Sequence, residues 1–165
     1  MTQENTADRR GCLYGIMHLF GSKTKEPSTG PMYPFKRKSY FLSKAEVSFY
    51  QVLKSTLQEK AVICPKIRLS DILSTETRNV TYWNQISQKH IDFLLCRPDT
   101  MEPILAIELD DSSHTSAKAQ KSDNFKNEAF KAAGLPLLRM SAKRGYNIEE
   151  LRTAIKSAMT KPSIT

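Results

Sequence analysis

Three acidic residues in two apolar segments are the side chains best placed to do chemistry. Asp92 lies inside the segment HIDFLLC (residues 90–96), and Glu108 and Asp110 end the segment PILAIELD (residues 103–110). Side chains alternate along a strand, so Glu108 and Asp110 should point to the same face. A carboxylate such as Asp92 inside an apolar strand needs a partner, because an unpaired charge is costly to bury.

A divalent metal ion is the partner that this pattern favours. The connection between the two apolar segments is short and turn-like, which predicts an antiparallel hairpin that brings the three carboxylates together. Close carboxylates raise one another's pKa values, and a cation removes that cost. Mg²⁺ or Mn²⁺ prefers oxygen ligands and can activate water for attack on a phosphate. The alternative is that these acids are exposed at strand ends or paired with Lys and Arg.

The surrounding sequence predicts an ordered α/β domain in which strands and helices form one mixed sheet with helices on its faces. Ser43 and Glu46 have capping-box spacing at the start of a helix that runs to about Gln58. Gly134 is well placed to end a later helix in a left-handed conformation. The expected elements, in order, are a helix over 43–58, a strand over 61–69 whose Pro65 suits an edge or a bend, a short helix or loop within 70–88 packed by Tyr82 and Trp83, strands over 90–96 and 103–109, a helix over 116–133, a strand over 135–140 and a helix over 147–159.

The chain of 165 residues has room for one ordinary domain with extensions. We expect residues 1–40 to form a basic, loosely ordered N-terminal extension, residues 41–160 to form the domain, and residues 161–165 to form a short tail. The formal net charge of +8 favours a polyanionic partner such as nucleic acid, since Lys and Arg displace counterions from phosphates. The alternative is that the basic surplus only keeps the protein soluble.

The cysteines and the apolar segments indicate a cytoplasmic protein. Cys12, Cys64 and Cys96 are scattered, which excludes zinc-type spacing and argues against a disulfide framework. We therefore expect reduced thiols in a reducing compartment. The apolar-rich run over residues 12–20 is too short to span a membrane. The sequence leaves open whether the chain forms a homodimer or binds a protein partner.

Taken together, the segments HIDFLLC, IELDDSSH and GLPLLRM, with a helix that carries Asp123 and Lys126, resemble the PD-(D/E)XK nuclease superfamily. The resemblance is strongest to a bacterial branch of uncharacterised nuclease-like domains related to the very-short-patch repair endonuclease. It covers about residues 41–140. It implies a restriction-endonuclease-like α-β-β-β-α-β core, with a mixed central sheet flanked by helices, and metal-dependent hydrolysis of phosphodiester bonds, with DNA as the expected substrate.

The resemblance also implies roles for individual residues. Asp92 matches the first metal-binding Asp and Glu108 matches the acidic residue of the D/E-x-K motif, whereas Asp110 stands where that motif usually has Lys. The usual Lys positions the attacking water and stabilises developing negative charge. Lys126 could supply this cation instead, and His114 could act as a general base or contact a phosphate. A solvated loop histidine and an exposed helix lysine are the alternatives.

Further residues complete the expected site. Asp123 and Gln120 would line the metal cleft, and Glu46 would be an accessory metal ligand, although its capping role already explains it. The expected nucleic-acid contacts are Lys36, Arg37, Lys38, Lys118, Lys121 and Arg139, of which Arg139 could instead balance the acids.

Three functions therefore remain open from the sequence. The first is a metal-dependent nuclease, most simply a deoxyribonuclease. The second is a catalytically inactive nucleic-acid-binding module of the same fold, which the missing motif Lys favours. The third is a protein-interaction domain whose basic surface meets an acidic partner.

Overall fold

The computed structural model describes residues 33–75, 80–110 and 117–160, with the backbone alone described for residues 117–120. The chain divides into two units, residues 1–38 and residues 39–165. In the described part of the first unit, residues 33–38 form neither a helix nor a strand and are exposed. The second unit carries every helix and strand described below.

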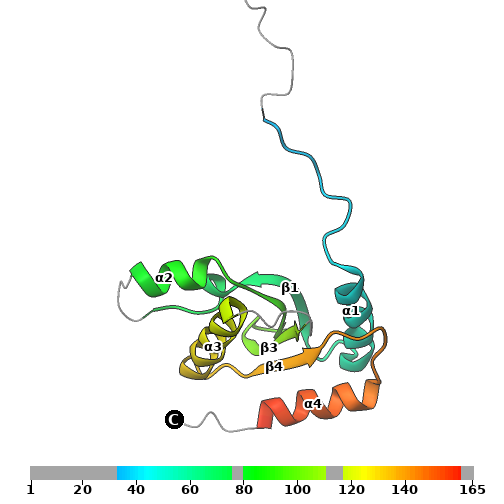
Figure 1. Ribbon diagram of the computed structural model, residues 1–165. Helices are drawn as coiled ribbons and strands as arrows, with labels where there is room; N and C mark the ends of the chain where they lie inside the picture. The colour runs from blue at the N-terminus through cyan, green and yellow to red at the C-terminus, as the bar shows by residue number, and fades with distance from the viewer. Residues whose placement is uncertain (1–32, 76–79, 111–116, 161–165) are drawn as a thin grey trace, which may run out of the picture. The chain divides into compact units, whose positions relative to one another are not determined.

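A four-stranded mixed sheet forms the centre of the second unit (Figure 1). Its strands are β1 (Val62–Arg68), β2 (His90–Cys96), β3 (Pro103–Asp110) and β4 (Leu137–Ser141), in the spatial order β1-β2-β3-β4. β2 runs antiparallel to β1 and β3, and β4 runs parallel to β3. The predicted β2–β3 hairpin is therefore confirmed, and Pro65 lies in an edge strand, as its missing N–H requires.

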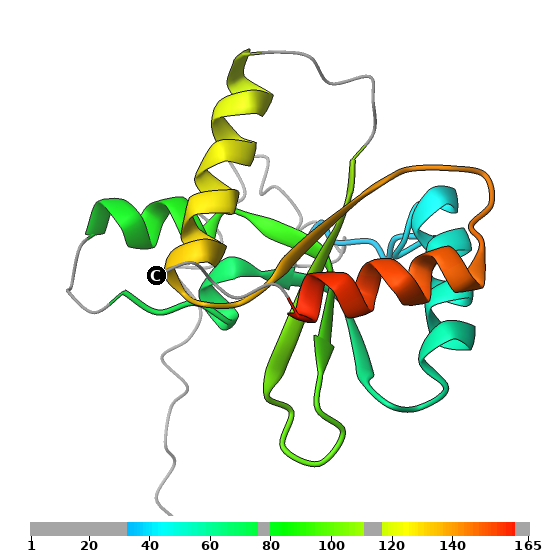
Figure 2. The same cartoon turned by 90° about the horizontal axis from the view of Figure 1, so that it is seen from below.

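Helices cover both faces of this sheet, which confirms the predicted α/β class. α1 (Lys44–Leu57) and α4 (Ile148–Thr160) lie on one face, whereas α2 (Val80–Ser87) and α3 (Ala117–Ala132) lie on the other (Figures 1 and 2). A 3₁₀ turn, η1 (Leu69–Asp71), follows β1. None of the helices in the described part of the chain is long and apolar enough to cross a membrane.

Alternation along the strands builds two separate hydrophobic cores. Phe93 and Leu95 of β2 belong to the first core, whereas Leu94 and Cys96 belong to the second. This alternation is what a strand buried on both faces requires. The buried residues of the first core are Phe49, Leu53, Phe93, Leu95, Leu105, Ile107, Leu151 and Ile155; those of the second are Leu69, Leu73, Ile86, Ile91, Leu94, Cys96, Ala106 and Phe130.

The predicted start of α1 is confirmed in its hydrogen bonds. The Glu46 carboxylate accepts a 2.8 Å bond from the Ser43 backbone N–H, and the Ser43 hydroxyl accepts a 3.3 Å bond from the Glu46 backbone N–H. These reciprocal bonds satisfy backbone donors that a helix start leaves unpaired.

The end of α3 explains why β4 begins later than predicted. Gly134 adopts a φ of +66°, and its N–H donates to the Lys131 carbonyl at 3.1 Å. The Leu135 N–H donates to the Phe130 carbonyl, also at 3.1 Å, which completes a Schellman motif. Because Leu135 belongs to this helix end, the strand begins at Leu137 instead of Leu135.

The segment between β1 and β2 corrects one expectation. A short helix, α2, does form there, but Tyr82 and Trp83 do not anchor it, because their exposed fractions are 55% and 49%. Ile86 is the buried side chain of this helix. A helix of two turns packs one narrow stripe against the sheet, and Ile86 occupies that stripe.

Candidate functional site

A row of charged side chains crosses the sheet where β3 and β4 end and β2 begins. Phe93 of β2 pairs with Ile107 of β3. Asp92 directly precedes Phe93 and Glu108 directly follows Ile107, so in these antiparallel strands the two acids become neighbours. Glu108 in turn pairs with Arg139 of the parallel strand β4. Asp92, Glu108 and Arg139 therefore line up on three adjacent strands, as the hairpin prediction required for the two acids.

Both carboxylate oxygens of Asp92 have partners. Oδ2 accepts a 2.9 Å hydrogen bond from the backbone N–H of Leu109, and Oδ1 accepts a 3.1 Å bond from Nζ of Lys66. The Asp92 side chain is 20% exposed. These bonds offset the free-energy cost of placing a carboxylate in an apolar strand.

Lys66 reaches the site from a break in the pairing of β1 with β2. It adopts a left-handed φ of 57°, and no pair joins it to β2 between Pro65, which pairs with Phe93, and Ile67. Lys66 is not among the residues expected from the sequence. The available signal was a lysine directly after a proline inside an otherwise apolar strand.

Lys66 links Asp92 to Glu46 at the start of α1. Its Nζ forms an ion pair with Oε1 of Glu46 in addition to the bond to Asp92. Burial opposes the charge of each group, but these bonds outweigh it. The pKa of Glu46 is therefore lowered, with help from its bonds to Ser43, and the pKa of Lys66 is raised. Glu46 thus caps the helix and also belongs to the charged network.

Glu108 is the most buried acid of the row. Its side chain and that of Lys126 on α3 are each 12% exposed, and Nζ of Lys126 forms an ion pair with Oε1 of Glu108. Nη2 of Arg139 lies 3.5 Å from Oε2, yet Oε2 is buried without a hydrogen-bond partner in the described part of the chain. Oε2 of Glu108 therefore has the Arg139 guanidinium as an ion-pair partner but receives no hydrogen bond.

The pKa of Glu108 lies above its ordinary value. Burial is the main cause, the negative charge of Asp92 adds to it, and the cations of Lys126 and Arg139 only partly oppose it. The contribution of Asp92 means that the two carboxylates lie close enough to repel each other. Removing that repulsion is what a shared cation would do.

Asp110 turns toward Arg139 instead of toward the other two acids. Nη1 of Arg139 donates to Oδ1 of Asp110 at 2.7 Å, and Nη2 lies 3.4 Å from Oδ1 of Asp123. Nε of Arg139 donates to Oδ1 of Asn127 at 3.1 Å. Arg139 thereby balances several acids at once, which was one of its two expected roles.

The expected cluster of three carboxylates is accordingly not assembled. Among the residues that the structure describes, no three His, Cys, Asp or Glu side chains come together as a group that could hold a metal ion. The physical reason is the guanidinium of Arg139, which holds Asp110. Asp92 and Glu108 are the two acids that the fold brings together.

Several expected site residues lie outside the described part of the chain or away from the row. His114 belongs to residues that are not described, and so do the side chains of Lys118 and Gln120. Lys121 is exposed on α3. Lys36, Arg37 and Lys38 are exposed in the first unit, whose placement relative to the second is not determined.

These features define an α/β protein with paired acids and cations at one end of a mixed sheet. A family model described as "Protein of unknown function (DUF2726)" matches residues 38–159, and the chain therefore belongs to this family. Searches of curated proteins and of solved structures gave no match. The site itself must therefore carry the functional argument.

Proposed function

We propose that this protein is a divalent-metal-dependent nuclease of the PD-(D/E)XK type that hydrolyses phosphodiester bonds in DNA. The observation that carries the proposal is the position of Asp92 and Glu108 on adjacent strands, each next to the Phe93–Ile107 pair, with Oε2 of Glu108 buried and without a hydrogen-bond partner in the described structure. A buried oxygen of this kind calls for an ion or a water.

The residues present fit a metal ion. Asp92 and Glu108 would hold it, because carboxylate oxygens are the ligands that Mg²⁺ and Mn²⁺ prefer. A bound ion of this kind supplies Lewis-acid polarisation of a phosphoryl oxygen and a water of lowered pKa. Binding of the cation would also relieve the repulsion that contributes to the raised pKa of Glu108.

Lys126 could replace the motif Lys that is absent at position 110. Asp110 stands at the motif position, but Lys126 on α3 forms an ion pair with Glu108, which lies two residues before Asp110 on the same strand. In the proposed reaction Lys126 stabilises the negative charge that develops on the phosphate. Arg139, 3.5 Å from the same carboxylate, is positioned to assist it. Lys66 holds Asp92 in place through the 3.1 Å bond.

The charge of the chain supports nucleic acid as the substrate. The formal net charge is +8, which favours a polyanion. Basic side chains outside the row, including the exposed Lys121 on α3, are available for phosphate contacts. These contacts would supply affinity without sequence readout.

One observation favours the alternative, a catalytically inactive nucleic-acid-binding module. Each acid of the row is already paired with a cation of the chain: Asp92 with Lys66, Glu108 with Lys126, and Asp110 with Arg139. Such a network can be stable without any metal ion. The two functions differ in whether a divalent cation displaces these cationic side chains.

Cleavage assays separate the two functions. Plasmid, linear and single-stranded DNA are incubated with the full chain in Mg²⁺ and in Mn²⁺, beside Glu108→Gln and the control Glu128→Gln, which alters an exposed acid of α3. We expect cleavage by the wild type and by the control, and none by Glu108→Gln or in the presence of EDTA. Cleavage that persists in EDTA or in Glu108→Gln would refute the proposal. DNA binding without cleavage by the wild type would establish the inactive module.

A further inference from the structure

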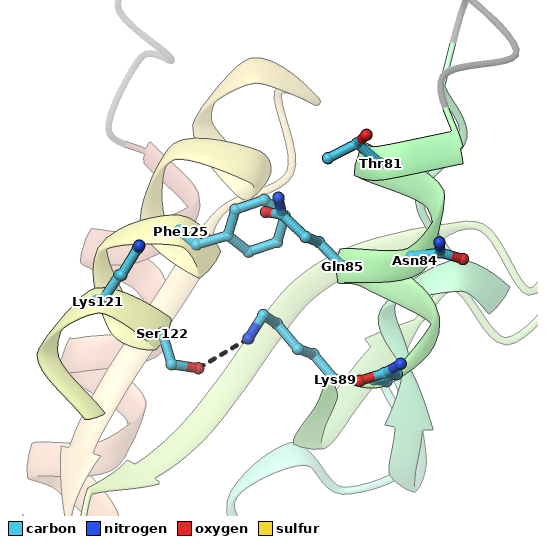
Figure 3. A pocket seen from close by; sticks show the side chains of 8 residues that line it. Thr81, Asn84, Gln85, Lys89, Lys121, Ser122 and Phe125 are labelled. Atoms are coloured by element: carbon cyan, nitrogen blue, oxygen red, sulfur yellow. Dashed lines mark hydrogen bonds between the residues drawn. The ribbon is translucent and has the colours of Figure 1, made fainter. Parts of the chain in front are cut away.

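A pocket between α2 and α3 lies outside the acidic site. Its volume is about 650 Å³, and its walls come from α2, the turn after it and α3 (Figure 3). Pockets of about 300–1,000 Å³ are typical of small-ligand sites. The pocket therefore has room for a group the size of a nucleotide.

Amide side chains form one wall of the pocket. Gln85 extends from α2 toward Phe125 (Figure 3), and Asn84 of α2 and Gln88 of the following turn are also lining residues. Each amide offers two N–H donors and one carbonyl acceptor. The edge of a nucleobase carries the same mixture of donors and acceptors. No acidic side chain is among the described residues that line the pocket.

The opposite wall, on α3, carries the Phe125 ring and Lys121, and Lys89 reaches toward it from the turn after α2 (Figure 3). Nζ of Lys89 lies 5.5 Å from the centre of the Phe125 ring and donates a 3.0 Å bond to the Ser122 hydroxyl. Lys121 lines the rim and is exposed. Within the described structure, neither lysine forms an ion pair with a carboxylate, so both charges are available to an anion.

The same helix connects this pocket to the acidic row. α3 presents Ser122 and Phe125 to the pocket, whereas Asp123 and Lys126, each one residue later, contact Arg139 and Glu108. Two neighbouring stripes of α3 therefore serve two different sites. A ligand in the pocket would therefore lie against the helix that carries Lys126.

We propose that this pocket binds one nucleotide of a single-stranded DNA. Phe125 contacts the base, the amides of α2 bond its edge, and Lys89 and Lys121 bind the neighbouring phosphates. A concave pocket with an aromatic wall reaches a base only when that base is unpaired and unstacked, as in a single strand or after extrusion from a duplex. The inference rests on the proposed function in taking this strand as the substrate.

Direct binding in EDTA tests the pocket separately from cleavage. An oligothymidylate of about 12 nucleotides is titrated into the full-length Glu108→Gln protein, and anisotropy of the labelled strand gives its Kd. The only tryptophan of the chain, Trp83 on α2, gives a second optical signal. The pocket variants are Asn84→Ala with Gln88→Ala, and Lys121→Ala. The matched control is Lys131→Ala, an exposed lysine in the last turn of α3.

We expect the double amide variant to bind about tenfold more weakly, with an unchanged salt dependence, because it removes base contacts and no charge. Lys121→Ala should also weaken binding and should lower the slope of log Kd against log salt by about 1. Lys131→Ala should bind like the parent. A duplex of the same length should bind more weakly than the single strand.

Three results would overturn the inference: unchanged binding in both pocket variants, duplex binding as tight as that of the single strand, or equal competition by polyglutamate, which would indicate an acidic protein partner. Failure of the nuclease proposal looks different. If the pocket variants lose binding but the wild type cleaves no DNA, the pocket binds a single strand and the cleavage proposal alone fails. If the wild type cleaves DNA and the pocket variants bind normally, only the pocket inference fails.

Discussion

The backbone N–H of Leu109 donates a 2.9 Å hydrogen bond to the carboxylate of Asp92. This bond lies just beyond the last regular β2–β3 pair on this side, Phe93 with Ile107. A side chain thus continues the connection between the two strands that carry the acids. Asp92 therefore has a structural role that can be separated from its proposed chemical one.

Replacing Asp92 separates these two roles. Asp92→Ala should lower the free energy of unfolding by about 2 kcal/mol, because it leaves the part-buried N–H of Leu109 without its protein partner. Asp92→Asn should be less destabilised, since its amide oxygen can still accept from Leu109. Both variants should lose cleavage. Urea unfolding measures the difference, and equal stability of the two variants would mean that the Leu109 bond contributes nothing measurable.

Lys66 should stabilise the junction of α1 with the sheet. It joins Glu46 of α1 to Asp92 of β2, so Lys66→Gln should lower the free energy of unfolding by about 1–2 kcal/mol at neutral pH. The pKa of Glu46 is lowered in the folded chain, so its stabilising charge disappears as the pH falls through that pKa. The difference in stability between the wild type and Lys66→Gln should therefore shrink at acid pH. The control is Lys60→Gln, an exposed residue after α1. Equal unfolding curves for wild type and Lys66→Gln would contradict this role.

Lys126 should have opposite effects on metal binding and on cleavage. Its ammonium pairs with the Glu108 carboxylate that a cation would use, so Lys126→Met should bind Mn²⁺ more tightly than the wild type. The same variant should cleave DNA about 100-fold more slowly, since it removes a charge that stabilises the transition state. Titration with Mn²⁺ and single-turnover cleavage test both effects. Mn²⁺ binding that weakens together with cleavage would instead mean that Lys126 only positions Glu108.

The thiol of Cys96 should be unreactive in the folded protein at ordinary pH. Burial, with a smaller contribution from Cys64 on the neighbouring strand, raises its pKa to about 11 from an ordinary 9.0. The thiolate is the nucleophile, so two pKa units predict alkylation at pH 8 that is about 100-fold slower than in the unfolded chain.

Raising the pH tests the sign of this shift. The folded chain keeps the Cys96 proton between pH 9 and 11, where the unfolded chain has lost it, so stability should fall as pH rises through that range. The rate at which iodoacetamide alkylates Cys96 is measured by mass spectrometry of the peptide that contains it. Equally fast labelling of folded and urea-unfolded protein at pH 8 would contradict the account.

Local signals in the sequence were sufficient to predict most of the elements. The Ser43–Glu46 capping box and Gly134 depend on neighbouring residues alone, and both were predicted correctly. The proximity of Asp92 and Glu108 followed from the short hairpin. The prediction that Tyr82 and Trp83 are packing anchors was wrong. Burial on a short helix depends on which stripe of residues meets the sheet, and tertiary packing decides that.

Lys126 and Arg139 were expected as cations of the site, but Lys66 and the individual ion pairs could not be predicted in the same way. Lys66 and Asp92 are 26 residues apart, and they meet only because a left-handed residue interrupts the β1–β2 pairing. Arg139 meets Asp110 across a parallel strand pair, and such pairs have no short connection to indicate them in the sequence. Long-range ion pairs of this kind appear only in the folded structure.

Calorimetric titration with Mn²⁺ tests most directly whether Asp92 and Glu108 share one cation. The wild type, Asp92→Asn, Glu108→Gln and the surface control Glu128→Gln are titrated under the same conditions. We expect the wild type and the control to bind one Mn²⁺ per chain at this site, and each of the other two variants to lose it. A wild type that binds no Mn²⁺, or a site that survives in either acid variant, would contradict the account.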